Sequence, residues 1–185
     1  QIMRSYIVQI DSLNQSNIAL RHENTQVRTK FKDVQSKNEE LTEKVEEASR
    51  KVEVASVLRA INIAAHGLNS NGKERNRTKQ INKFRACFTI DQNKIVEPGL
   101  KTVYMRIITP AEFVLENQQL DSVRVNDTKI MYSAKRDLEY NNEAIDMCIY
   151  YQVYEPLPEG EYIFEIIHGN HVIGSSKLEL KKSIL

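Results

Sequence analysis

Reactive chemistry in this chain could come first from its two cysteines, Cys87 and Cys148. A cysteine nucleophile needs a histidine base and a group that orients the base, and neither stands near a cysteine in the sequence. The acidic neighbours Glu143 and Asp146 would disfavour a reactive thiolate at Cys148. The sequence therefore predicts no cysteine nucleophile.

Two histidines, His168 and His171, flank a Gly-Asn pair near the end of the chain. A metal site usually needs three or four ligands, and no third ligand stands close to them in the sequence. The chain also lacks a glycine-rich phosphate loop, a nucleophile elbow and zinc-ligand spacing. We therefore expect a protein that is not an enzyme and that holds no metal or other cofactor.

Binding is a better use for the side chains Tyr150, Gln152 and Tyr154, which alternate along one predicted strand. Alternation places all three on the outward face, where aromatic rings beside polar groups can stack on sugars or anchor a protein partner. Tyr104 could join them if its strand lies alongside. Ordinary outward tyrosines, or a patch covered by a partner chain, are the alternative interpretation.

Residues 73–85 carry six basic residues against one acid. Such a segment could contact phosphates, but its only aromatic residue, Phe84, fits a core position better than base stacking. The net charge of +1 also argues against a dedicated nucleic-acid or membrane-surface protein. We favour a solvated basic linker. The positions that could contact an anion are Lys73, Arg75, Arg77 and Lys79.

The strongest pattern in the chain occupies its first 55 residues. With Met3 at heptad position a and Tyr6 at d, apolar side chains recur at a and d through Ala55, and only three asparagines interrupt them. This strict seven-residue repeat, free of Gly and Pro, predicts a left-handed coiled coil rather than a helix packed on its own domain. We expect oligomerisation through the seam positions Ile10, Leu13, Asn17, Leu20, Asn24, Val27, Phe31, Val34, Asn38, Leu41 and Val45.

The partner of this helix must be another molecule, because the rest of the chain offers no second long helix. Asn17, Asn24 and Asn38 at position a favour a parallel homodimer in fixed register, since paired Asn side chains can hydrogen-bond across the seam. At 1.5 Å per residue the rod would be about 80 Å long. A trimer or a heterodimer remains open.

Charges beside the seam give it little selectivity. Most g positions in the second half of the rod are lysines opposite uncharged e positions. We expect these lysines to pair within their own helix, Lys37 with Glu40 and Lys44 with Glu47.

The coil is predicted to end near Ser56, and a strand is favoured from residue 57 to residue 65. Seven to nine short alternating runs separated by turn residues then indicate an all-β sandwich or barrel. In these runs Cys87 and Cys148 alternate with the apolar side chains, so both should point away from the core. We expect two free thiols, and a disulfide on the outer face only if the two strands are neighbours.

Three segments carry a family resemblance: Phe-Arg-Ala-Cys-Phe-Thr-Ile at 84–90, Glu-Pro-Gly-Leu-Lys-Thr-Val-Tyr at 97–104 and Pro-Glu-Gly-Glu-Tyr-Ile-Phe-Glu-Ile at 158–166. With the coil and the basic segment, the order resembles Bacteroidota proteins in which a coiled coil precedes a small immunoglobulin-like domain. Some of these are labelled chromosome-partitioning proteins. The resemblance implies an architecture and no catalytic residues. It also implies a membrane-spanning segment before the coil, which would fit a chain that begins at Gln1.

These observations predict an α+β chain in segregated segments: a coiled coil at 1–56, a first strand and basic linker at 57–83, and an immunoglobulin-like β-sandwich at 84–182. The expected function is that of a structural or adaptor homodimer presenting paired binding domains in the periplasm or at the membrane of the cell envelope. A carbohydrate- or peptide-binding module and a DNA-associated protein are the alternatives, as is a cytoplasmic location.

Overall fold

The protein is described from a computed structural model that covers the backbone of residues 2–182 and their side chains, except those of residues 2, 4–6 and 8. The predicted d position Tyr6 therefore lies outside the described side chains. The chain divides into two compact units, Gln1–Val52 and Glu53–Leu185.

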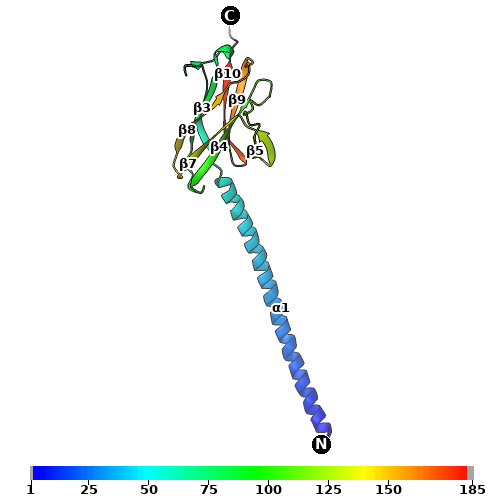
Figure 1. Cartoon of the computed structure of the whole chain (residues 1–185). Coiled ribbons are helices and arrows are strands. Elements are labelled where there is room, and N and C mark those ends of the chain that lie inside the picture. Colours follow the sequence, from blue (N-terminus) through cyan, green and yellow to red (C-terminus); the bar gives the residue numbers. More distant parts are fainter. Residues whose placement is uncertain (1, 183–185) are drawn as a thin grey trace. The chain divides into compact units, whose positions relative to one another are not determined.

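The first unit consists of a single helix, α1 (Ile2–Ala55), which is continuous over 54 residues (Figure 1). It ends one residue before the predicted position. No residue in it breaks the hydrogen-bonded ladder, since the stretch contains no Gly and no Pro. The long helix that the heptad pattern predicted is thus confirmed.

The ion pairs along α1 differ from the predicted ones. Lys44 Nζ lies 2.6 Å from Glu40 Oε1, and Lys51 Nζ lies 2.7 Å from Glu47 Oε1. Both pairs place the acid four residues before the base, the order and spacing that stabilise a helix best. All four side chains are more than 60% exposed, so each pair contributes only a few tenths of a kcal/mol.

The second unit is a β-sandwich, as predicted, with two four-stranded antiparallel sheets and a separate hairpin. The first sheet has the order β2 (Glu74–Arg75), β1 (Ala60–Leu68), β3 (Lys83–Ile90), β8 (Ile145–Gln152). The second has the order β10 (His171–Leu180), β9 (Gly160–His168), β4 (Gly99–Ile108), β7 (Ala134–Tyr140). The hairpin joins β5 (Ser122–Val125) and β6 (Thr128–Met131).

The core lies between the two sheets and contains the apolar alternation read from the sequence. Along β3 every second side chain from Phe84 to Ile90 is buried. The Phe84 ring contacts two rings of β9, with centroid distances of 5.6 Å to Tyr162 and 5.4 Å to Phe164. Such aromatic contacts add specific geometry to the burial that holds the layers together.

The strand predicted at 57–65 is present as β1, but the segment after it is not a linker outside the sandwich. β1 pairs with β3 along most of its length, so it is an inner strand of the first sheet. The basic segment that follows forms β2, which pairs with the end of β1, and the short 3-10 helix η1 (Thr78–Gln80). Backbone bonds with Lys181 hold this segment to the end of the chain. It is part of the sandwich.

The buried pair Tyr132-Ser133 separates β6 from β7. The Ser133 amide donates to Met105 O at 2.8 Å, and Ser133 Oγ accepts a bond from the Ile107 amide at 2.9 Å. A polar side chain thus takes the place of ladder bonds where the chain enters the second sheet.

The expectation of two free thiols is wrong. Cys87 in β3 stands directly opposite Cys148 in β8, and the two form a disulfide with an S–S distance of 2.03 Å and a Cα–Cα distance of 4.0 Å. Both side chains point away from the core, as the alternation predicted. The bond therefore links neighbouring strands on the outer face of one sheet, which is the alternative that the sequence left open.

Candidate functional site

The apolar seam of α1 is exposed along its whole described length. Its large side chains are between 58% and 69% exposed at Ile10, Leu13, Leu20, Val27, Phe31, Val34, Leu41 and Val45. Full burial of one such side chain stabilises a structure by about 1.5–3 kcal/mol. Packing a second helix against this stripe would therefore bury these side chains and stabilise the complex strongly relative to the single chain.

The seam asparagines are exposed as well. Arg21 Nε donates to Asn17 Oδ1 at 3.0 Å within the helix. This bond uses one acceptor site of the amide and leaves its two donor hydrogens for other partners.

In the second unit, the predicted ligand face is only partly assembled. Tyr150 and Tyr154 are 51% and 58% exposed, although Tyr154 lies beyond the end of β8. The ring of Tyr154 stands perpendicular to that of the buried Tyr151, with centroids 6.2 Å apart. Gln152 Nε2 donates to Asn82 O at 2.8 Å, so this amide is partly committed to the fold.

Two adjoining hollows flank Tyr154, and together we call them the Tyr154 groove. The larger, of about 650 Å³, is lined by residues 113–118 and 153–155 together with Leu120 and Tyr151. The smaller, of about 360 Å³, is lined by residues 117–119, 132–135 and 150–152 together with Tyr154. Asn117, Gln118, Tyr151 and Tyr154 line both.

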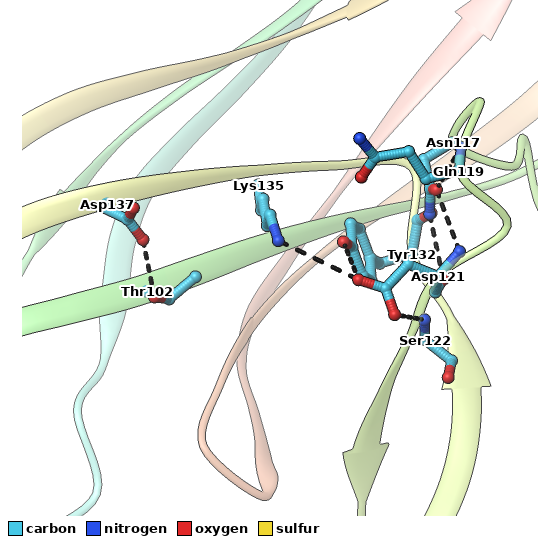
Figure 2. Close-up of polar contacts among 8 residues, drawn as sticks. All are labelled: Thr102, Asn117, Gln119, Asp121, Ser122, Tyr132, Lys135 and Asp137. Carbon is cyan, nitrogen blue, oxygen red and sulfur yellow. Dashed lines mark hydrogen bonds and ion pairs between the residues drawn. The ribbon is translucent and has the colours of Figure 1, made fainter.

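Asn117 shapes the loop between the two hollows (Figure 2). Its Nδ2 donates to Asp121 O at 3.0 Å and to Tyr132 O at 2.7 Å. Its Oδ1 accepts bonds from the amides of Gln119 at 3.0 Å and Asp121 at 3.1 Å. The side chain thereby uses its full hydrogen-bonding capacity, so it holds the loop and is not available to a ligand.

Asp121, Tyr132 and Lys135 form a polar cluster beside the smaller hollow (Figure 2). The Tyr132 hydroxyl donates to Asp121 Oδ2 at 2.9 Å, Lys135 Nζ lies 4.0 Å from the same oxygen, and the Ser122 amide donates to Asp121 Oδ1 at 2.8 Å. The Tyr104 ring packs on Tyr132 at a centroid distance of 4.8 Å. Tyr104 lies in β4, which belongs to the other sheet than β8, so its strand does not lie alongside that of Tyr150.

The cluster sets the protonation of its members. The Ser122 amide and then the Tyr132 hydroxyl lower the pKa of Asp121 below its ordinary value, whereas burial and then the bond to Asp121 raise the pKa of Tyr132. Near neutral pH the carboxylate is therefore charged and the phenol is protonated. The pair fixes the wall of the groove and is not poised to exchange protons.

Removing one of these bonds has a predictable effect. In the Tyr132→Phe variant we expect the pKa of Asp121 to rise, yet to stay below its ordinary value because the Ser122 amide remains. A lowered carboxyl pKa stabilises the fold above the unfolded-state pKa, and this contribution disappears as the pH falls through the folded-state pKa. The variant should therefore lose it at a higher pH than the wild type. Carboxyl NMR titration measures this, and an unchanged Asp121 pKa would contradict it.

The predicted anion contacts do not form one row. Lys73 precedes β2, Arg75 lies in it, Arg77 forms a bridge with Lys181, and Lys79 lies in η1. The acid within the segment is already occupied, since Glu74 Oε1 lies 2.7 Å from Arg85 Nη2.

A metal site finds no support in the described part of the chain, where no three His, Cys, Asp or Glu side chains are grouped to hold an ion. Within the same residues, no helix is both long enough and apolar enough to cross a membrane.

Residues 60–181, about two thirds of the chain, match the family model "Domain of unknown function (DUF8428)". The chain belongs to the DUF8428 family. Residues 1–46 match a second model, "Coiled-coil region of unknown function (DUF8429)". The DUF8428 domain thus follows a coiled-coil region, in agreement with the heptad pattern.

No curated protein matched this DUF8428 chain. Among solved structures it is similar to an immunoglobulin-like protein from Pseudomonas aeruginosa, with 14% identity and a TM-score of 0.35, over 69% of this chain and 98% of that one.

Sequence reasoning missed most of the groove of this DUF8428 domain. The loop that walls it carries Asn117, Asp121 and Leu120, which read only as turn residues between strands. The one local signal for the loop was Asn117 itself, because an Asn side chain can accept hydrogen bonds from backbone amides a few residues further on. No pattern in the sequence predicted that this loop lies next to the end of β8.

Proposed function

We propose that the protein is a non-enzymatic adaptor that pairs through α1 with a second copy of itself and so presents two β-sandwich domains together. The observation that supports this is the stripe of large apolar side chains on α1, exposed from Ile10 to Val45. A stripe confined to positions a and d fits a second helix and little else.

A parallel arrangement follows from the asparagines at position a. In a parallel homodimer each Asn meets its own copy and the two amides can bond, whereas in other registers each is buried against apolar side chains. The function of such a rod is positional. Pairing raises the effective concentration of two weak binding faces, so that their combined affinity exceeds that of either one.

We further propose that the protein works in the periplasm or at the membrane of the cell envelope. The disulfide between Cys87 and Cys148 supports this, because structural disulfides persist in oxidising compartments and are rare in the cytosol. The Bacteroidota affiliation, and the anchor before the coil that goes with it, stay predictions from the resemblance. Thiol labelling of intact cells tests the compartment, and two labelled thiols would count against it.

Site-directed cross-linking tests the pairing. The chain has a mass of 21.4 kDa, so a dimer would have twice that, 42.8 kDa. With cysteine at the d position in Leu13→Cys, oxidation should give a covalent dimer on a non-reducing gel, because a parallel coil brings the two copies of residue 13 together. The matched control Gln15→Cys places the thiol on the outward f position and should stay uncrosslinked. A monomer in sedimentation, or equal cross-linking of both variants, would refute the proposal.

A second candidate function is ligand binding by each domain. The exposed rings of Tyr150 and Tyr154 beside the Tyr154 groove favour it, since a concave surface lined by aromatic and a few polar groups is the usual form of a binding site. From the sequence, carbohydrate and peptide were equal alternatives for this face.

A further inference from the structure

The larger hollow of the Tyr154 groove exposes an unusual amount of apolar surface. Phe113 is 73% exposed, Leu120 is 66% exposed and Tyr154 is 58% exposed, and all three line the same hollow. Half-buried Leu115 and Val153 line it as well. Exposed apolar side chains gathered around a concavity mark a binding surface more often than single scattered ones do.

The walls of this hollow are held in place. The Thr109 amide donates to Phe113 O at 2.8 Å, and the Leu115 amide donates to Ile107 O at 2.9 Å, which attaches the wall to β4. The Tyr151 hydroxyl donates to Glu116 O at 3.1 Å and attaches the same wall to β8. The site is therefore largely preformed, so binding of a ligand would cost little conformational entropy.

The rim of the hollow is acidic. Glu116 and Glu155 line it and are exposed, and among the described residues neither forms an ion pair. Burial raises the pKa of Tyr151 to about 12, and the nearby Glu155, Tyr154 and Glu116 add smaller contributions in the same direction. The site thus combines an apolar floor with unpaired negative charge.

We propose that the larger hollow of the Tyr154 groove binds a short peptide segment of a partner protein, with a large apolar side chain seated between Phe113, Leu120 and Tyr154 and an adjacent lysine or arginine facing Glu116 and Glu155. This deepens the proposed function, since it names the partner that paired domains would capture. Binding itself is a property of one domain and does not need the pairing.

A peptide fits this hollow better than a sugar does. A sugar ring presents hydroxyls in several directions and needs polar groups held to meet them. The side-chain amide of Asn117 at this site already makes four hydrogen bonds to the backbone around it and has none left for a ligand. The remaining charged groups are two carboxylates of the same sign, which complement a cationic side chain.

Peptide selection on the whole chain of 185 residues tests this inference. Random 12-residue peptides displayed on phage are panned on the immobilised wild type, and a recovered peptide is synthesised with a fluorescent label for polarisation titration. We expect recovered sequences to combine an aromatic or branched apolar residue with a neighbouring lysine or arginine. Tyr154→Ala should weaken binding of the labelled peptide roughly 30-fold, as loss of a central aromatic contact does.

Charge is tested separately with matched variants. Glu116→Gln with Glu155→Gln keeps the shape of the rim and should weaken the same peptide about tenfold and flatten its salt dependence. The control, Glu139→Gln with Glu143→Gln, removes two exposed acids elsewhere and should change affinity less than about twofold. Selection of no peptides, peptides without a basic residue, equal binding by the rim variant, or Tyr154-dependent binding of neutral glycans on an array would each overturn the inference.

The two proposals fail separately. A protein that sediments as a dimer but selects no peptide refutes the groove inference alone. A monomer that still selects apolar-basic peptides refutes the pairing alone.

Discussion

Replacing Leu20 and Leu41 together with aspartate is expected to turn the proposed dimer of 42.8 kDa into a 21.4 kDa monomer. Both residues occupy d positions, and both are exposed in the single chain, so the change costs the monomer little. In a dimer it would place two pairs of like charges in the apolar seam, and burying an unpaired carboxylate costs several kcal/mol. Sedimentation equilibrium measures the change in mass.

The matched control is Gln15→Asp with Ser36→Asp. It adds the same charge and similar helix propensities at outward f positions, which are exposed in the chain and would stay exposed in a dimer. We expect this variant to remain dimeric, and both variants to keep the near-ultraviolet circular dichroism of the folded domain. An unchanged dimer in the Leu20 and Leu41 variant would rule out α1 as the element that pairs.

The second large effect is expected from the disulfide. Cys87→Ala with Cys148→Ala should lower the free energy of unfolding of the domain by roughly 2–4 kcal/mol. The bond joins residues 61 positions apart in the chain, so its loss frees a long loop in the unfolded state while the strand pairing of β3 and β8 remains. Guanidinium chloride unfolding followed by near-ultraviolet circular dichroism gives the difference.

A neighbouring cross-strand pair serves as the control. Thr89 Oγ1 donates to Asp146 Oδ1 at 2.6 Å across the same two strands. Thr89→Ala with Asp146→Ala removes a hydrogen bond but no covalent link, so we expect a loss of about 1 kcal/mol. Reduction of the wild type should match the cysteine variant. If reduction and the cysteine variant each lower the free energy of unfolding by less than about 0.5 kcal/mol, the disulfide does not constrain the unfolded domain.

The features that the sequence predicted are those that repeat locally. The heptads of α1 need no knowledge of the rest of the chain, and neither does the alternation of buried and exposed side chains along β3. The two-residue turn at Gly169-Asn170 between β9 and β10 is local as well, and Gly169 has the positive φ (56°) that such a turn requires.

The features that the sequence did not predict depend on which strands become neighbours. Alternation placed Cys87 and Cys148 on outer faces, but only the pairing of β3 with β8 brings the sulfurs together. In the same way, Leu120 and Tyr154 look like unrelated exposed residues until a loop before β5 meets the end of β8. No local periodicity encodes these distances between segments.

The disulfide also determines how the domain would respond to mechanical load. When the domain is pulled from residues before Cys87 and after Cys148, tension passes into the strands that carry these two cysteines. Because the sulfurs of Cys87 and Cys148 are covalently joined, force bypasses the roughly 60 residues between them, which would otherwise lengthen by about 200 Å when pulled straight. Under oxidising conditions only the residues before Cys87 and after Cys148 could therefore extend under such a pull. Reduction would allow the segment between them to extend as well.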